Sequence, residues 1–139
     1  MCKFLPFMTC LCPTYKRPSF LRNALACYLA QDYPEDRRQL IIFDDVPQHH
    51  CQGGESWHLW PQVKRFDSLP KKFDAMVRIA PAADVFVVWE DDDYYLPSHL
   101  SEIAEVYCLD MPQYFVSEDI WSTYGEPQGQ AHREGAAGR

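Results

Sequence analysis

The feature that most constrains this chain is a short apolar run that ends in four consecutive carboxylates, V-F-V-V-W-E-D-D-D-Y-Y-L-P from Val85 to Pro97. A wholly apolar run as short as Val85–Trp89 is typical of a strand buried on both faces of a sheet. The acids at 90–93 would then stand where that strand leaves the sheet. Adjacent carboxylates repel one another, whereas hard cations such as Mg²⁺ and Mn²⁺ prefer oxygen ligands of this kind. The run therefore favours a metal site over a solvated acidic turn.

Short apolar runs alternate along the chain with stretches of helical spacing. The predicted strands are Phe7–Cys12, Leu40–Phe43, Val85–Trp89 and Gln113–Ser117, with a short strand or a covering segment at Trp57–Trp60. The predicted helices run from Pro18 or Ser19 to before Asp32, from Lys71 to Ala80, and from a cap at Ser98 to about Leu109. This alternation predicts an α/β fold with a mainly parallel sheet flanked by helices. Beyond Gly125 we expect no packed pattern.

Distinctive polar residues follow three of the predicted strands. The first strand ends in P-T-Y-K-R, the second in Asp44 and Asp45, and the third in the acidic run. If the strands are parallel, all three groups lie at the carboxyl edge of the sheet, where such folds bind ligands. This edge would offer an aromatic side chain, a carboxylate for a nucleobase or ribose, and a metal for phosphates. The sequence therefore predicts a site for a nucleotide diphosphate.

Composition narrows the possible partners and location. The chain has 139 residues, which is one domain or part of one, and its net charge of −7 argues against nucleic acid as the main partner. No apolar run approaches the roughly 18–20 residues of a membrane span. The 6 cysteines come without a secretory signal, so we expect free thiols and a cytoplasmic protein. Cys51 lies near His49, His50 and His58 in sequence, but the usual spacing of zinc ligands is missing.

Four motifs together carry a family resemblance. P-T-Y-K-R-P-S-F-L-R-N-A-L, L-A-Q-D-Y-P, L-I-I-F-D-D and V-V-W-E-D-D-D-Y-Y-L-P, taken in this order from about Pro6 to Leu100, resemble the donor-binding half of the family 2 glycosyltransferases. The resemblance implies a GT-A fold, which is Rossmann-like, in truncated form. Residues 1–124 would be the incomplete donor-binding domain. Residues 125–139 would be a tail or the start of a missing acceptor-binding part.

The resemblance also implies roles for single residues. It assigns donor nucleotide binding to Thr14, Tyr15, Asp44, Asp45, Lys72, Asp91 and Asp92, and the metal, Mn²⁺ or Mg²⁺, to Asp91 and Asp93. Tyr15 would pack on the base, and Asp45 would read the base or ribose with support from Asp44. The acidic run would be the family's D-x-D motif. Asp74, two positions after Lys72, stands where the family often has Asn. The contact of Lys72 with the diphosphate is therefore the least typical part of the pattern.

The implied reaction is metal-dependent transfer of a sugar from a nucleotide-diphosphate sugar to an acceptor hydroxyl, with inversion. The acceptor, whether glycan, lipid or protein, is not identified by the sequence. The general base should lie downstream of the acidic run, where Glu118 and Asp119 are candidates at short spacing. Two alternatives stay open: a non-catalytic nucleotide-sugar or metal-binding module, and a Mg²⁺-dependent phosphotransferase or receiver-like domain. The second should have an aspartate after the first strand, where Pro13 and Thr14 stand.

Overall fold

The computed structural model describes residues 4–46, 50–80, 82–116, 119–122 and 132–135. The chain forms two compact units, Met1–Leu109 and Asp110–Arg139. The strands of the first unit are β1 (Met8–Thr14), β2 (Arg38–Asp44), β3 (Gln52–Gly53), β4 (Trp57–Pro61) and β5 (Val85–Val88). Its helices are α1 (Pro18–Leu29), the short 3₁₀ helix η1 (Glu35–Arg37), α2 (Leu69–Ile79) and α3 (His99–Asp110), which ends at the boundary between the units.

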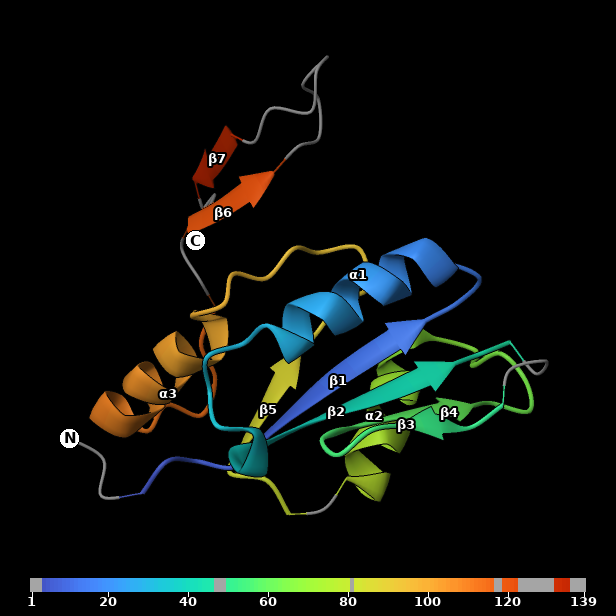
Figure 1. Cartoon of the computed structure of the whole chain (residues 1–139), viewed down its shortest axis with the longest axis horizontal. Coiled ribbons are helices and arrows are strands. Elements are labelled where there is room, and N and C mark those ends of the chain that lie inside the picture. The colour runs from blue at the N-terminus through green and yellow to red at the C-terminus, as the bar shows by residue number, and fades with distance from the viewer. Residues whose placement is uncertain (1–3, 47–49, 81, 117–118, 123–131, 136–139) are drawn as a thin grey trace. The chain divides into compact units, whose positions relative to one another are not determined.

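The five strands of the first unit form one mainly parallel sheet in the order β3-β4-β2-β1-β5 (Figure 1). β1 pairs in parallel with both β2 and β5, and β4 pairs in parallel with β2, whereas β3 is antiparallel to β4. Thr14 lies opposite Asp44, and Leu11 lies opposite Val88. The carboxyl ends of β1, β2 and β5 therefore meet at one edge, and the predicted mainly parallel α/β fold is confirmed.

Helices cover both faces of this sheet. Ala24 of α1 and Leu100 of α3 pack with Cys10 and Ile42 on one face. On the other face, Met76 of α2 packs with residues such as Leu11. The strands alternate between the two clusters because successive side chains of a strand point to opposite faces. The start of α1 at Pro18 was predicted correctly, whereas α2 begins at Leu69, two residues before the predicted Lys71. Pro occupies the first turn of both helices, where its missing N–H costs nothing.

β5 differs from the expectation of a strand buried on both faces. It lies at the edge of the sheet, and among the described strands it pairs with β1 alone. Val87 and Trp89 point into the core, at 6% and 0% exposure, whereas Phe86 and Val88 are 43% and 55% exposed. The prediction was wrong because α2 packs over β1 and β2, which leaves the second face of β5 open.

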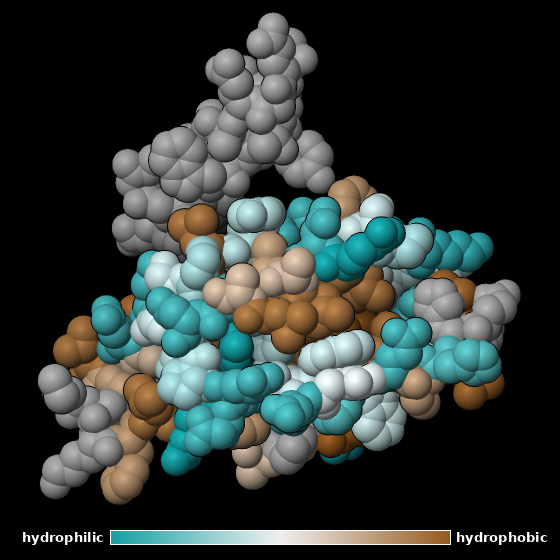
Figure 2. All heavy atoms as spheres, viewed as in Figure 1, coloured by the Kyte–Doolittle hydropathy of each residue, from teal (hydrophilic) through white to brown (hydrophobic). Residues whose placement is uncertain are grey.

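The surface of the α1 side is mostly hydrophilic at its margins. Figure 2 shows hydrophobic residues gathered around α1 in the middle of this face, with hydrophilic residues around them. Two apolar side chains of α1, Phe20 and Leu29, are 45% and 51% exposed. No helix in the described part of the chain combines the length and apolar character needed to cross a membrane.

The second unit contains a small antiparallel sheet of β6 (Asp119–Ser122) and β7 (His132–Gly135). One expectation for this region was wrong. Residues 113–116 of the expected strand are not in a strand, and Tyr114 and Val116 there are 86% and 77% exposed because no strand pairs with them. β7 lies in the stretch beyond Gly125. The expectation that this stretch has no packed pattern stays a prediction, because its side chains lie outside the description.

The cysteines follow the expectation in part. Cys10, Cys12 and Cys27 are free and buried, and Cys51 is free and exposed. Cys108, however, is disulfide-bonded, so the expectation of free thiols was wrong for this residue. It is half-buried near the end of α3, whereas Cys10, Cys12 and Cys27 are buried in the core. A cytoplasmic location stays a prediction.

Candidate functional site

The loop after β1 is the centre of the candidate site. β1 ends at Thr14, and α1 begins at Pro18 with Arg17 as its N-cap residue. Lys16 adopts the left-handed backbone region with φ 54°, which few residues other than glycine favour. This tight turn sends the chain from the sheet into the helix within three residues and exposes Tyr15 and Arg17 at the edge.

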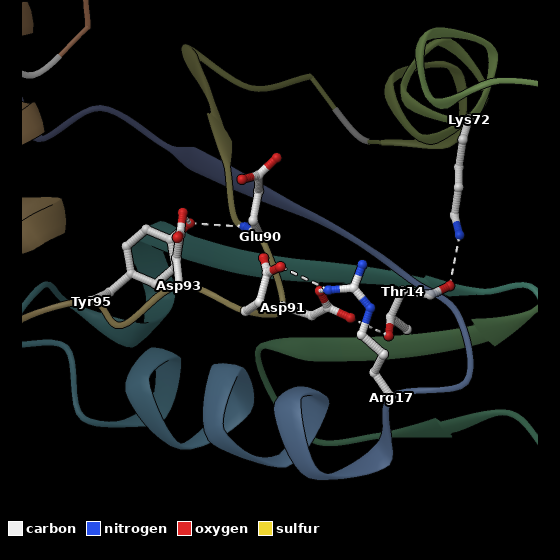
Figure 3. Close-up of polar contacts among 8 residues, drawn as sticks. Thr14, Arg17, Lys72, Glu90, Asp91, Asp93 and Tyr95 are labelled. Carbon is white, nitrogen blue, oxygen red and sulfur yellow. Dashed lines mark hydrogen bonds and ion pairs between the residues drawn. The ribbon is translucent and has the colours of Figure 1, made fainter. Parts of the chain in front are cut away.

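Thr14 connects the groups that the sequence predicts to converge (Figure 3). Its hydroxyl donates a hydrogen bond of 2.7 Å to the Asp91 carboxylate. Its carbonyl oxygen accepts hydrogen bonds from Lys72 Nζ at 2.8 Å and from the Asp45 N–H at 3.4 Å. The ends of β1, β2 and β5 and the first turns of α2 are therefore linked through one buried residue.

Lys72 and Asp45 form an ion pair at the floor of the site. Lys72 Nζ lies 2.9 Å from Asp45 Oδ1, and the two side chains are 5% and 4% exposed. The other oxygen of Asp45 accepts the Phe66 N–H at 3.3 Å. Asp44, beside them, accepts the N–H of Val46 at 3.1 Å and so caps the turn after β2. In this arrangement Lys72 holds protein oxygens, and its direct contact with a diphosphate stays a prediction.

A cavity of about 470 Å³ opens at this edge of the sheet. Its lining residues are Pro13, Thr14, Tyr15, Arg17, Asp45, Arg65, Phe66, Asp67, Ser68, Leu69 and Lys72. Three cations and two carboxylates line it, although the whole chain carries a net charge of −7. The N-cap residues of two helices, Arg17 of α1 and Ser68 of α2, also belong to the lining, so both positive helix ends face this region. The cavity is suited to an anion.

Tyr15 and Arg65 lie together on one wall of the cavity. The Arg65 guanidinium carbon is 4.3 Å from the centroid of the Tyr15 ring, a cation–π contact. Sequence reasoning missed Arg65, because it belongs to none of the four motifs. The signal was present, however: β4 is a parallel strand that ends at Pro61, and the basic stretch V-K-R follows it at the carboxyl edge.

The acidic run divides into one inward and three outward carboxylates. Asp91 is 4% exposed and, besides Thr14, is bound by Arg17 at 3.1 Å. Asp92 also pairs with Arg17, at 2.8 Å. Carboxylate oxygens of Glu90, Asp92 and Asp93 all lie within 4.8 Å of one another. The structure thus brings Asp93 into a close acidic group, hereafter the outer acids (Glu90, Asp92 and Asp93), and it holds Asp91 apart from that group.

The outer acids fit a hard divalent cation. Burial, and after it the charge of Asp93, raise the pKa of Glu90 above its usual range. Burial and the charge of Asp92 likewise raise the pKa of Asp93, in spite of its hydrogen bond from Tyr95. The raised pKa values mean that burial and the neighbouring carboxylates disfavour the ionised forms of Glu90 and Asp93, and a bound cation would offset this. Three oxygen donors at this spacing are a ligand set for Mg²⁺ or Mn²⁺.

Tyr95 fixes the shape of the acidic loop. Its hydroxyl accepts the Glu90 N–H at 2.8 Å and lies 3.4 Å from Asp93 Oδ2, to which it donates. Its ring stacks on Trp89 with centroids 3.8 Å apart. Trp89 is fully buried, and its indole N–H donates to the carbonyl of Ala24 at 3.1 Å. The loop is therefore anchored to the core through two aromatic rings.

Glu118 and Asp119, the two candidates for a general base, come later in the sequence than the residues that make these contacts. Glu118 lies outside the described residues. Asp119 is the first residue of β6, in the second unit, and its side chain is likewise outside the description. Both assignments stay predictions.

Comparison with known proteins supports the fold. No protein-family model matches the chain, and no curated protein sequence matches it. The mannosyltransferase PcManGT from Pyrobaculum calidifontis, solved with GDP-Man and Mn²⁺, is similar with a TM-score of 0.62 and 18% identity, over 79% of this chain and 34% of that one. S. aureus TarS 1–349, solved with UDP-GlcNAc, is similar with a TM-score of 0.61 and 14% identity, over 72% of this chain and 30% of that one. This chain therefore spans about a third of the length of each structure and shares the fold of the part that it matches.

Proposed function

We propose that this chain is the donor-binding part of a glycosyltransferase, which holds a nucleotide-diphosphate sugar at the carboxyl edge of its sheet. The observation that carries the proposal is the cavity beside Tyr15, rich in cations, next to the outer acids at the same edge. Such an arrangement offers separate binding places for a nucleobase, for phosphates and for a divalent cation. The similar structures were solved with GDP-Man and Mn²⁺ and with UDP-GlcNAc, ligands of that class.

In the proposed complex, the nucleobase lies in the cavity against Tyr15. Asp45, which lines the cavity, is the residue assigned to the base or ribose, with Thr14 and Asp44 holding the loops around it. The diphosphate faces Arg17 and the N-terminal ends of α1 and α2, because anions are stabilised at helix N-termini. The resemblance adds Lys72, Asp91 and Asp92 as further donor contacts.

The outer acids, Asp93 among them, are proposed to hold Mn²⁺ or Mg²⁺. The resemblance also assigned Asp91 to the metal, but Asp91 points inward and is held by Thr14 and Arg17. A bound divalent cation stabilises the negative charge that develops on the leaving diphosphate. The residues of this chain would orient the donor and exclude water from one side of it. Transfer with inversion further needs a carboxylate base for the acceptor hydroxyl, for which Glu118 and Asp119 are the candidates.

The proposal is tested by calorimetric titration with UDP, GDP, UDP-GlcNAc and GDP-Man in the presence of Mn²⁺. We expect one of the two nucleotide series to bind. Tyr15→Ala should weaken that binding about tenfold, since stacking on an aromatic ring contributes about 1–3 kcal/mol per base. Val63→Ala is the matched control, because Val63 is 93% exposed in the loop that carries Arg65 and does not line the cavity. Equal nucleotide affinities of Tyr15→Ala and Val63→Ala would argue against a nucleobase packed on Tyr15.

A second candidate function is a nucleotide-sugar-binding module without transfer. The observation that favours it is that both carboxylates lining the cavity are ion-paired: Asp45 with Lys72 at 2.9 Å and Asp67 with Lys71 at 2.9 Å. Each of these carboxylates is engaged with an ammonium group of the protein, and neither is turned toward an acceptor. Release of free sugar or transfer to added acceptors, measured by chromatography after incubation with the donor that binds, would establish the enzyme. Tight donor binding with no turnover would establish the module.

A further inference from the structure

We propose that Arg17 exchanges partners during donor binding: it pairs with Asp92 before the divalent cation binds and with the donor diphosphate afterwards. This inference rests on the proposed function and adds to it a residue that couples the metal to the nucleotide. None of the motif-based roles described above involves Arg17.

Arg17 stands between the two halves of the site. Its Nη1 lies 3.1 Å from Asp91 Oδ1 and 2.8 Å from Asp92 Oδ2, and Figure 3 shows its side chain reaching toward the acidic loop. The same residue lines the cavity with Tyr15 and Lys72. One side chain therefore reaches both the acidic run and the space proposed for the phosphates.

Among the described residues, Arg17 forms ion pairs with Asp91 and Asp92, and these two pairs differ in how easily they break. Asp92 is 35% exposed and Arg17 45%, so water and salt screen this pair and its contribution is small. Asp91 is 5% exposed at its side chain and is also held by the Thr14 hydroxyl, so it stays in place if the guanidinium leaves. Separation of Arg17 from Asp92 thus costs little and leaves the buried carboxylate with a hydrogen-bond partner.

Asp92 is also one of the outer acids, which places Arg17 in competition with a divalent cation. Asp92 lies within 4.8 Å of Glu90 and Asp93, measured between carboxylate oxygens. A guanidinium at 2.8 Å from Asp92 repels a second cation on the same carboxylate. The guanidinium that leaves Asp92 needs a new anion, and the planar fork of arginine matches a phosphate. The diphosphate in the adjoining cavity supplies that anion.

The competition predicts opposite changes in two affinities when Arg17 is replaced. Arg17→Gln should bind Mn²⁺ alone about three- to tenfold more tightly than the wild type, because a competing cation is removed. The same variant should bind UDP or GDP in the presence of Mn²⁺ about tenfold more weakly, because a charged hydrogen bond to phosphate is lost. Arg17→Lys, which keeps the charge but not the fork, should restore Mn²⁺ affinity to the wild-type value and nucleotide affinity only in part.

The experiment titrates the whole chain with Mn²⁺ by electron paramagnetic resonance and with nucleotide by calorimetry, after thermal unfolding has shown that each variant folds. Arg22→Gln is the control, since Arg22 is another exposed arginine of α1 outside the cavity lining, and it should change neither affinity. Unchanged or weaker Mn²⁺ binding in Arg17→Gln would overturn the exchange. If the wild type binds Mn²⁺ but no nucleotide, the proposed function falls, and with it the diphosphate as the second partner of Arg17.

Discussion

Replacement of Lys72 by methionine should destabilise the fold strongly, although this lysine was first identified as a ligand contact. Its Nζ donates to the Thr14 carbonyl at 2.8 Å and pairs with Asp45 at 2.9 Å, with both side chains about 95% buried at 5% and 4% exposure. Removal of one partner of a buried ion pair leaves an uncompensated charge and costs about 3–5 kcal/mol. Since the free energy of unfolding of small domains is about 5–15 kcal/mol, Lys72→Met should lose a large part of its stability.

The neighbouring lysine provides a matched control. Lys71 pairs with Asp67 at 2.9 Å, but these side chains are 66% and 77% exposed, so Lys71→Met should cost less than about 0.5 kcal/mol. Urea unfolding followed by tryptophan fluorescence and by far-ultraviolet circular dichroism measures both variants. The double variant Lys72→Met with Asp45→Asn should recover part of the loss, because the orphaned charge is removed as well. Equal costs for Lys72→Met and Lys71→Met would refute the buried-pair interpretation.

Three further predictions concern the loops at the edge of the sheet. Because the pKa values of Glu90 and Asp93 are raised in the folded state, the folded state binds protons more readily than the unfolded state. The stability of the fold should therefore fall as pH rises from the usual to the raised pKa values of these groups. Metal-free Asp93→Asn should therefore have a higher Tm than the wild type at pH 7 and a smaller change with pH in differential scanning calorimetry. Tyr95→Phe should lower the free energy of unfolding in urea by about 1 kcal/mol and weaken Mn²⁺ binding, because the Glu90 N–H loses its acceptor. Tyr94 is 83% exposed, so Tyr94→Phe should leave the stability and the Mn²⁺ affinity unchanged. Lys16→Gly should raise the free energy of unfolding by about 0.5–1 kcal/mol, because φ at this residue is 54° and glycine adopts such an angle without strain. A lower free energy of unfolding would mean that the contacts of the lysine side chain outweigh the backbone strain.

The convergence of the strand ends was predictable because it follows from local patterns and one topological rule. Apolar runs at β1, β2 and β5, each followed by polar residues, give a shared edge once the strands are parallel. Thr14 then lies within hydrogen-bond distance of both Asp91 and Lys72, residues 77 and 58 positions away. The sequence could predict the meeting of these groups, but it could not predict which atom meets which.

The parts that the sequence missed depend on tertiary packing. The apolar run of β5 looks the same whether a helix covers both faces or one, and here the neighbouring α2 packs over β1 and β2. Within the acidic run, pleating and the turn after Val88 decide which carboxylate points inward, and D-x-D spacing alone does not select between Asp91 and Asp92. Arg65 belongs to none of the motifs and contributes through its contact with the Tyr15 ring. Arg17 stands in the P-T-Y-K-R group, but that motif does not specify its ion pair with the acidic loop across the fold.

In the proposed complex, the outer acids and the cavity bind a nucleotide diphosphate together with a divalent cation. The most direct measurement is the Kd of the wild type and of Asp93→Ala for UDP and GDP, each with and without Mn²⁺, by calorimetry. We expect one nucleotide to bind the wild type at least about tenfold more tightly with Mn²⁺, a difference of about 1.4 kcal/mol, and Asp93→Ala to lose that gain. Failure of the wild type to bind either nucleotide, or an equal gain from Mn²⁺ in Asp93→Ala, would contradict the claim.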